Sequence, residues 1–340
     1  MQEIFIDFNI NFKKNTIVFK QILGFIINNP GFNFNLNSNS KKKIRIGSLE
    51  SFKKNLKKKS NQNIIGLLTS GTTGSPKIVK NKLKIKKKKS KDKLIWLLTY
   101  SPYRWAGISV LLHTIINDLE IVIPSSINPL DILKKIHLVT AISMTPSFFK
   151  KMLLYTNKKK IFKNIKQITF GGEYVNQSTL DLSKKIFPNA RLTSIYAISE
   201  IGDICTSSDG KEGFEKNKFK KFKFINNELI INNKKTNDLW QLKKDRYFFL
   251  GRKNDIVNIG GNTISLQVVK NELNKIKEIK IFKLKSLANP ILGNIIELEY
   301  VGNISQNNIE SKLIKKLPKY ALPISFKKLK NIELNSNNKS

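Results

Sequence analysis

The chain has 340 residues and 40% hydrophobic content, which is typical of a folded globular protein with one large core or two unequal cores. Its single cysteine, Cys205, excludes an internal disulfide framework, and Cys205, His113 and His137 show no metal-ligand spacing. The longest apolar stretch, residues 108–123, is interrupted by polar side chains. No segment therefore approaches the roughly 20 apolar residues that a membrane-spanning helix needs, and we expect no membrane span.

The formal net charge of +38 is compatible with a polyanionic partner. Five of the 62 basic residues are arginine, the residue that binds phosphates and guanine in bidentate fashion. The chain is also crowded with Asn, Ile and Phe, whose codons are rich in A and T. We attribute the lysines to genome composition and a solvated surface, and expect no specific nucleic-acid partner. The first twelve residues lack the basic start of a secretory signal, so a cytoplasmic protein is expected.

The elements expected in chain order begin after a polar front region. Residues 10–32 carry apolar residues at mixed spacing, residues 33–43 read as a loop, and two lysine-rich runs read as exposed helix faces or loops. Strands are expected at 94–98, 119–123, 141–143, 165–170 and 191–197. Helices are expected at 106–116, 129–136, 147–154 and 178–186. Strands that alternate with helices of this length predict βαβ units around a largely parallel sheet.

The pattern changes to hairpins beyond residue 222. Strands at 223–225, 228–231 and 247–250 are separated by Asn-rich turns and predict a β-rich subdomain. After a turn-dense segment at 251–261, a helix at 266–276 and strands at 278–282 and 295–301 predict a small α+β terminal domain.

An apolar strand runs into a loop of hydroxyls, glycines and one lysine at residues 67–77. Gly71 and Gly74 allow backbone N–H groups to turn toward phosphate oxygens, the hydroxyl groups can hold a metal or a phosphate, and Lys77 adds positive charge. The spacing differs from the G-x-x-x-x-G-K-[ST] nucleotide loop. It resembles the phosphate loop of the adenylate-forming superfamily, which includes acyl-CoA synthetases, luciferases and the adenylation domains of peptide synthetases.

The resemblance implies that this loop holds the phosphates of ATP. The residues concerned are Thr69, Ser70, Gly71, Thr72, Thr73, Gly74 and Lys77. The hydroxyl of Thr72 is also expected to contact Mg²⁺ and to take part in catalysis.

The family's adenine-binding motifs follow in the expected order. A strand leads into Gly171-Gly172-Glu173, which matches the turn that lies along the adenine. Tyr196 then matches the aromatic that stacks on the base.

The segment after Tyr196 completes that pattern. Ser199 replaces the family's Thr and keeps the hydroxyl, whereas Ala197 replaces a usual Gly. Glu200 follows, and the resemblance implies that it ligates the Mg²⁺ that bridges the phosphates and acts in catalysis.

The next motifs concern the ribose and the terminal domain. Asp238 occupies the place of the family's ribose-binding carboxylate, in Thr-Asn-Asp instead of Thr-Gly-Asp. Arg252 should also bind the ribose, and Asn254 stands where the family's hinge Asp lies. Gly260 and Gly261 would let the terminal domain approach the pantetheine thiol of the substrate after a large rotation.

Two further assignments complete the expected site. Counting the family's interval from Pro323 places the catalytic lysine at Lys339, within an eroded motif; a coincidental lysine is the open alternative. Trp105 lies near the family's acid pocket, where its ring either gates the acyl channel or anchors the next helix.

The resemblance covers about residues 64–339. In its short length the chain is similar to some o-succinylbenzoate-CoA ligases and to short acyl ligases of polysaccharide clusters, and residues 209–214 and 289–293 resemble the second group more. The resemblance implies an α/β fold: a large N-terminal domain with mostly parallel sheets and a β-rich subdomain, plus a small mobile α+β C-terminal domain. The expected boundaries are a shortened region at 1–60, an AMP-binding core at 61–251, and a terminal domain at 252–340 after a hinge near 254.

The implied activity is the ATP-dependent activation of a small carboxylic acid, with transfer of the acyl group to CoA or to the phosphopantetheine thiol of a carrier protein. ATP and Mg²⁺ are the implied cofactors. The alternative is a non-catalytic nucleotide- or polyanion-binding remnant of such an enzyme. The acid, the acceptor and the oligomeric state stay open.

Overall fold

The structure is a computed structural model that describes residues 2–5, 12–28, 33–36, 44–45, 50, 64–69, 77–82, 93–102, 104–156, 160–198 and 201–334. The chain divides into two compact units. The first unit contains Met1–Met144, Phe162–Gly172 and Tyr196–Ile204, and the second contains Thr145–Ile161, Glu173–Ile195 and Cys205–Ser340. The domain boundaries and the mobility expected from the sequence stay predictions.

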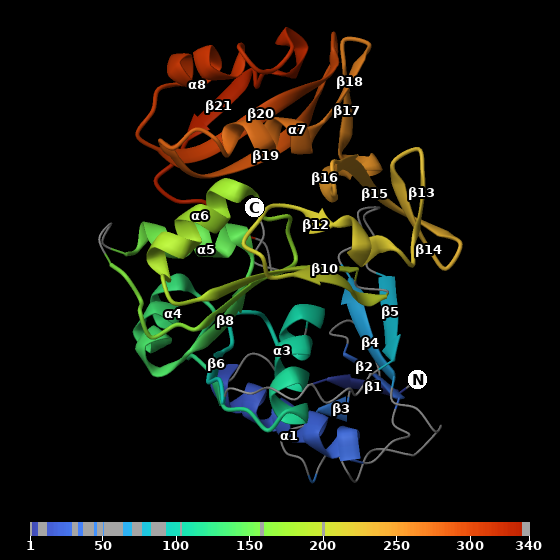
Figure 1. The fold of residues 1–340 in the computed structure, drawn as a ribbon, viewed down its shortest axis with the longest axis vertical. Coiled ribbons are helices and arrows are strands. Elements are labelled where there is room, and N and C mark those ends of the chain that lie inside the picture. The colour runs from blue at the N-terminus through green and yellow to red at the C-terminus, as the bar shows by residue number, and fades with distance from the viewer. Residues whose placement is uncertain are drawn as a thin grey trace. The chain divides into compact units, whose positions relative to one another are not determined.

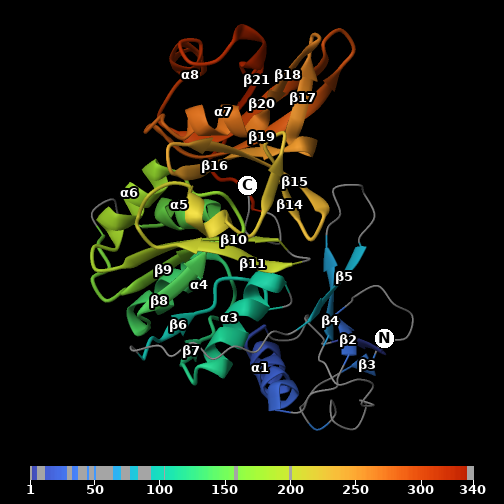
Figure 2. The ribbon, with the colours of Figure 1, turned by 45° about the vertical axis from the view of Figure 1, so that its right-hand side comes forward.

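One sheet of the first unit has the strand order β3-β1-β2-β4-β5 among the described residues. Its strands are β1 (Gln2–Phe5), β2 (Asn33–Leu36), β3 (Ile44–Arg45), β4 (Ile64–Thr69) and β5 (Lys77–Lys82). The pairings are parallel except for β4 and β5, which form an antiparallel hairpin visible in Figure 2. The loop expected over residues 33–43 is therefore wrong at Asn33–Leu36, because parallel pairing with β1 and β4 overrides the low strand propensity of Asn.

Helix α1 (Phe12–Asn28) lies in the front region, where the mixed spacing of apolar residues had predicted no definite element. Phe19, Ile22 and Leu23 are fully buried and follow helical spacing, so they form one face. The helix contacts α3 (Trp105–Ile116) of the same unit. None of the helices in the described ranges has the length and apolar character needed to cross a membrane.

A second sheet has the order β11-β10-β9-β8-β6-β7 in the described part of the chain (Figure 1). Its strands are β6 (Trp96–Leu97), β7 (Ile121–Val122), β8 (Ala141–Met144), β9 (Gln167–Phe170), β10 (Arg191–Ile198) and β11 (Gly202–Ser207). The pairs β6–β7, β6–β8 and β8–β9 are parallel, and α3, α4 (Pro129–Lys135) and η1 (Ile136–Leu138) lie between strands in sequence. The predicted βαβ units around a largely parallel sheet are confirmed.

The second unit contains α5 (Pro146–Leu154), α6 (Gln177–Ile186) and a β-rich subdomain. The subdomain's sheet has the order β12-β16-β15-β14-β13 among the described residues. Its elements are β12 (Phe214–Glu215), η2 (Lys216–Phe219), β13 (Lys223–Ile225), β14 (Glu228–Ile231), β15 (Lys234–Lys243) and β16 (Arg246–Arg252). Each neighbouring pair in this sheet is antiparallel, which confirms the predicted hairpins and adds β15 between β14 and β16.

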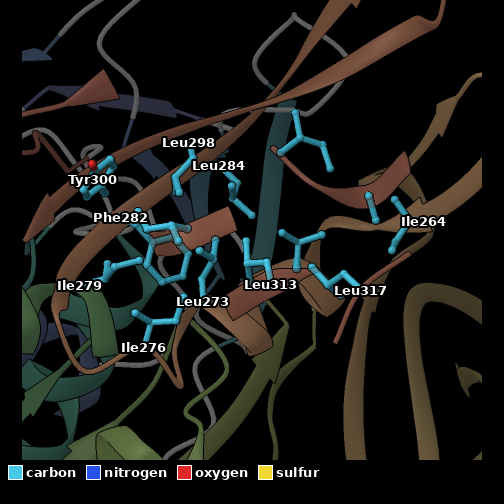
Figure 3. Packing of buried hydrophobic residues seen from close by; sticks show 14 of the residues in the cluster. Ile264, Leu273, Ile276, Ile279, Phe282, Leu284, Leu298, Tyr300, Leu313 and Leu317 are labelled. Atoms are coloured by element: carbon cyan, nitrogen blue, oxygen red, sulfur yellow. The ribbon is translucent and has the colours of Figure 1, made fainter. Parts of the chain in front are cut away.

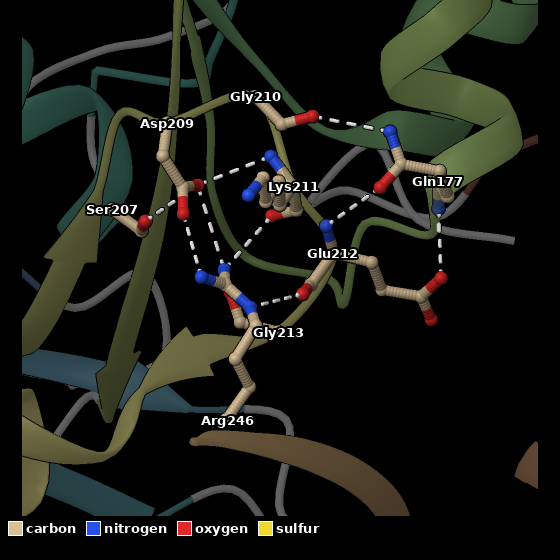
Figure 4. A network of polar contacts seen from close by, with 8 residues as sticks. All are labelled: Gln177, Ser207, Asp209, Gly210, Lys211, Glu212, Gly213 and Arg246. Carbon is tan, nitrogen blue, oxygen red and sulfur yellow. Dashed lines mark hydrogen bonds and ion pairs between the residues drawn. The ribbon is translucent and has the colours of Figure 1, made fainter. Parts of the chain in front are cut away.

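Arg246 organises the loop that precedes β12 (Figure 4). Its guanidinium pairs with Asp209 at 2.6 Å and donates to the carbonyls of Glu212 and Gly213 at 2.9 and 2.8 Å. Gln177 and Glu212 exchange two hydrogen bonds of 2.9 Å, each from a backbone N–H to the other's side-chain oxygen. These contacts tie the loop to both α6 and β16, because a planar guanidinium can satisfy several acceptors at once.

The terminal elements pack around one apolar core, shown in Figure 3. They are η3 (Lys253–Asp255), β17 (Ile256–Ile259), β18 (Asn262–Ser265), α7 (Leu266–Leu273), β19 (Ile279–Asn289), β20 (Gly293–Gly302), α8 (Gln306–Leu313), η4 (Lys319–Ala321) and β21 (Ser325–Lys328). Phe282 and Leu284 lie on one face of β19, as do Ile296 and Leu298 on β20, because residues two apart in a strand share a face. These side chains are buried against the helices. The predicted α+β character is confirmed, and β17, β18, α8 and β21 are added. The turn-dense segment expected at 251–261 is wrong at Ile256–Ile259, because antiparallel pairing with β18 makes these residues a strand.

The opposite face of this terminal sheet meets α5. Leu154 packs with Ile281, Val301 and Ile332, while Lys150 donates from its ammonium nitrogen to Asn274 Oδ1 at 2.5 Å. Burial lowers the pKa of Lys150 from 10.5 to about 8, and the nearby charge of Glu173 opposes this shift. The ammonium group also lies 5.8 Å from the centre of the Phe282 ring, a cation–π contact.

The terminal core supplies a stability test. Leu298→Ala should lower the free energy of unfolding by about 3 kcal/mol, because Leu298 is fully buried and its loss leaves a cavity. Ile291→Ala is the control: Ile291 is 89% exposed, so its change should stay within about 0.5 kcal/mol. Urea denaturation measures both, and equal losses would contradict the assigned core.

Lys150 supplies a pH test. Between pH 8 and 10.5 the unfolded chain binds the Lys150 proton more completely than the folded chain, so unfolding becomes harder as pH rises through that window. The unfolding free energy of the wild type should therefore rise relative to Lys150→Met by on the order of 1–3 kcal/mol. Denaturation at pH 7.5 and 10.5 measures it. The exposed-site variant Lys185→Met should track the wild type, and a pH-independent difference for Lys150→Met would refute the account.

Candidate active site

The hairpin of β4 and β5 brings together the two ends of the phosphate loop. The register pairs Ile64 with Lys82 at one end and Thr69 with Lys77 at the other, so residues 70–76 connect the strands. Ser70, Gly71, Thr72, Thr73 and Gly74 lie outside the described residues. The sequence predicted a strand before the loop, and the structure adds the returning strand that fixes Lys77 opposite Thr69.

Parallel strands of the first unit end at one edge of the second sheet. Gly171 follows β9, and its N–H donates to the carbonyl of Met144 at the end of β8, at 3.2 Å. The hydroxyl of Tyr100 donates to the carbonyl of Gly171 at 3.5 Å. Gly172 has φ +82°, a conformation that favours glycine. The predicted adenine turn therefore begins where open α/β sheets bind their ligands.

Tyr196 lies in β10 and is half-buried, in the same unit as the phosphate-loop hairpin and the Gly171-Gly172 turn. Ser199 and Glu200, the next residues of the motif, lie outside the described residues, as does Lys339. Within the described ranges, no group of three or more His, Cys, Asp or Glu residues could hold a metal ion.

Trp105 is the first residue of α3 and is half-buried. Its ring lies beside β11, with Cζ2 3.8 Å from where a Cβ at Gly202 would stand. Its indole N–H is buried and has no acceptor in the part of the chain that the structure describes. A buried donor of this kind can serve a ligand oxygen, but the indole N–H groups of Trp96 and Trp240 are also buried without an acceptor among the described residues, so the feature does not set Trp105 apart.

Glu173, the last residue of the predicted adenine turn, caps α5 in the second unit. One carboxylate oxygen accepts from the backbone N–H of Ser147 and the other accepts from its hydroxyl, both at 3.0 Å. A carboxylate is favoured there because the first turn of a helix exposes unpaired N–H groups and a partial positive charge. Glu173 thus anchors its end of the turn to α5, a role that the sequence did not reveal.

Asp238 and Arg252 form a cross-strand pair in the second unit. They are register partners on β15 and β16, and Arg252 Nε donates to Asp238 Oδ1 at 2.9 Å. Asp238 is 1% exposed, while the Arg252 side chain is 51% exposed. The structure therefore brings together the two residues that were predicted, 14 positions apart, to bind the ribose.

A bulge in β15 aims Asp238. Asn237 has φ +62°, and the register between β14 and β15 shifts at this point. Thr236 donates from its hydroxyl to the carbonyl of Leu229 at 2.8 Å and accepts from the N–H of Asp238 at 3.2 Å. Asn tolerates the left-handed conformation, which explains how Thr-Asn-Asp can replace Thr-Gly-Asp.

Gly260 and Gly261 form the two-residue turn between β17 and β18. Both have positive φ, +56° and +82°, as the favoured hairpin turn requires. The N–H of Gly260 donates to the carbonyl of Leu292 at 2.8 Å. A Cβ at Gly261 would meet no atom within 4 Å, so one side of the tip is open.

The described residues fit a ribonucleotide. A buried carboxylate accepts hydrogen bonds from vicinal hydroxyl groups, and Arg252 holds one Asp238 oxygen in place while the rest of its guanidinium remains accessible. The sequence missed Glu228, which supports the bulge; its signal was a lone acid opening the apolar strand Glu-Leu-Ile-Ile.

Comparison with known proteins gives consistent sequence relatives. The chain is 23% identical over 312 residues to the 2-succinylbenzoate–CoA ligase of Lactococcus lactis, covering 80% of this chain and 68% of the relative. It is 22% identical over 341 residues to the D-alanine–D-alanyl carrier protein ligase of Staphylococcus aureus, covering 83% and 70%.

Solved structures share the fold. The o-succinylbenzoate CoA synthetase of Bacillus subtilis in complex with its acyl-adenylate intermediate matches with a TM-score of 0.65 and 16% identity, covering 99% of this chain and 86% of that one. ATP-bound MatB from Rhodopseudomonas palustris matches with a TM-score of 0.68 and 12% identity, with the same coverage. A model of the AMP-binding enzyme family matches residues 20–239, about two thirds of the sequence, and the chain belongs to that family.

Proposed function

We propose that the chain activates a carboxylic acid with ATP and passes the acyl group to a thiol. In the first step a carboxylate oxygen bonds to the α-phosphorus of ATP and pyrophosphate leaves, giving an acyl-adenylate. In the second step the thiol sulfur bonds to the acyl carbon, its proton is lost and AMP leaves. The observation that carries the proposal is the Asp238–Arg252 pair, a buried carboxylate at the position of the family's ribose-binding residue, in a chain of the AMP-binding family.

The proposed roles of the binding residues follow the motifs. Thr69 to Lys77 hold the phosphates at the tip of the β4–β5 hairpin, the Gly171-Gly172 turn and Tyr196 hold the adenine, and Asp238 with Arg252 holds the ribose. Glu200 and Thr72 would hold Mg²⁺, whose charge lowers the repulsion between the incoming carboxylate and the phosphates. Lys339 would stabilise the developing charge on the α-phosphate.

The acid would enter beside Trp105. The buried indole N–H without an acceptor among the described residues suits a polar oxygen of the acid or of the adenylate. The ring itself would limit the acyl channel, as the sequence position predicts. This assignment favours a compact acid. A screen of acids with pyrophosphate release as the readout would identify the acid.

The acceptor would be CoA or the phosphopantetheine arm of a carrier protein. Sequence relatives of both kinds, a CoA ligase and a carrier-protein ligase, support a thiol acceptor. We assign the chain to the acyl-CoA synthetase type, with a core at 61–251 and a mobile terminal domain at 252–340 that turns about a hinge near Asn254. The open side of the Gly260-Gly261 turn would then line the thiol's path.

Acid-dependent exchange of pyrophosphate into ATP tests this function. The wild type should catalyse exchange with at least one member of a broad acid panel, because adenylate formation is reversible. Lys77→Ala and Glu200→Ala should each lower the exchange rate at least about 100-fold, since both remove charge next to the triphosphate. Absence of exchange with every acid would favour the alternative of a non-catalytic nucleotide-binding or polyanion-binding remnant.

Asp238→Ala tests the ribose assignment. Loss of a charged hydrogen-bond acceptor should raise the KM for ATP in the exchange reaction roughly 10- to 100-fold. The matched control is Asp245→Ala, an exposed acid in the turn between β15 and β16, which should leave that KM unchanged. A normal KM for Asp238→Ala would contradict the assignment.

A further inference from the structure

Glu228 is a buried acid beside the ribose pair, and no sequence motif considered above assigns it a role. It opens β14, is 2% exposed, and faces β15 across the sheet. Burying a carboxylate is costly unless both of its oxygens are satisfied. Both oxygens of Glu228 have partners, and each partner is a neighbour in sequence of a ribose-binding residue.

The first oxygen supports the bulge. Glu228 Oε1 accepts from the backbone N–H of Asn237 at 3.0 Å. Glu228 is the register partner of Leu239 and Ile230 that of Lys235, so β15 has two extra residues in the bulge, outside the regular ladder. Through this hydrogen bond the Glu228 carboxylate fixes the backbone next to Asp238.

The second oxygen contacts the residue that follows β16, Lys253 at the start of η3. Glu228 Oε2 pairs with Lys253 Nζ at 2.6 Å, and Lys253 follows Arg252 directly. The hydrogen bond from Lys253, assisted by the N–H of Asn237, holds the pKa of Glu228 below its ordinary value. The carboxylate therefore stays ionised at neutral pH and contacts β15 at Asn237 and η3 at Lys253.

We propose that Glu228 is the positioning residue of ribose recognition: it fixes Asn237 and Lys253, and through them sets the geometry of the Asp238–Arg252 pair. It touches neither nucleotide nor acid and acts through its neighbours. The proposal rests on the proposed function, because it takes Asp238 and Arg252 as the groups that bind the ribose hydroxyls.

The affinity ratio between ATP and 2′,3′-dideoxyATP tests this role. Isothermal titration measures both dissociation constants without any acid substrate. The wild type should prefer ATP roughly 10- to 100-fold, because only ATP presents the hydroxyls to Asp238. Glu228→Ala should bring the ratio to within about threefold of one, mostly by weakening ATP, since a relaxed bulge no longer aims the carboxylate.

Three variants keep the test interpretable. Glu228→Gln should restore most of the ratio, because its amide oxygen can still accept from Asn237. Glu228→Asp keeps the charge but cannot reach both partners, so it should lower the ratio even if Glu228→Ala fails to fold. Glu297→Ala removes another buried, lysine-paired carboxylate, from the terminal sheet, and should leave the ratio unchanged.

Two outcomes would overturn the inference in different ways. A wild type that binds both nucleotides equally would refute the ribose assignment, and with it the role of Glu228. A wild type that discriminates, together with Glu228→Ala and Glu228→Asp variants that keep the full ratio or weaken both nucleotides equally, would refute the role of Glu228 alone.

Discussion

The proposed ribose site depends on one constraint, the salt bridge between Asp238 and Arg252 across adjacent strands. Both strands are irregular where the pair forms, because a bulge in β15 displaces the ladder and η3 begins directly after β16. The buried Asp238 carboxylate is stabilised by the Arg252 charge. Next to this pair, Glu228 accepts from the Asn237 N–H and forms a salt bridge with Lys253. These contacts hold the Asp238 carboxylate of the short polar segment Thr-Asn-Asp in the position that the proposed ribose contact requires.

The sequence predicted most of the fold where local pattern and tertiary pairing agree. The alternating strands and helices from β6 to β10 and the terminal helix α7 were visible because their apolar residues follow one period. The sequence did not predict strands whose formation depends on pairing with distant segments. The strand β2 carries two Asn residues, and β15 reads Lys-Lys-Thr-Asn-Asp-Leu-Trp-Gln-Leu-Lys, so only their neighbours in the sheets make them strands. Helix α8 buries just Ile309 and Leu313, too few apolar positions to reveal it.

The sequence could predict the residues of the candidate site that belong to recognisable motifs. Order along the chain identified Asp238 and Arg252, and the structure pairs them. It could not reveal what holds them, because the contacts of Glu228 and Ser147 join segments that no spacing rule connects. The two roles considered for Trp105 stay predictions, because its buried indole N–H without an acceptor among the described residues is shared by Trp96 and Trp240.

Binding of a nucleotide at the bulged segment of β15 is tested most directly by hydrogen–deuterium exchange with and without Mg·ATP. Peptides that cover residues 228–252 should exchange more slowly in the presence of Mg·ATP, while peptides from β19 and β20 serve as the internal reference. Protection concentrated at 228–252 would support binding at this segment. Unchanged exchange across that segment at saturating Mg·ATP would contradict it.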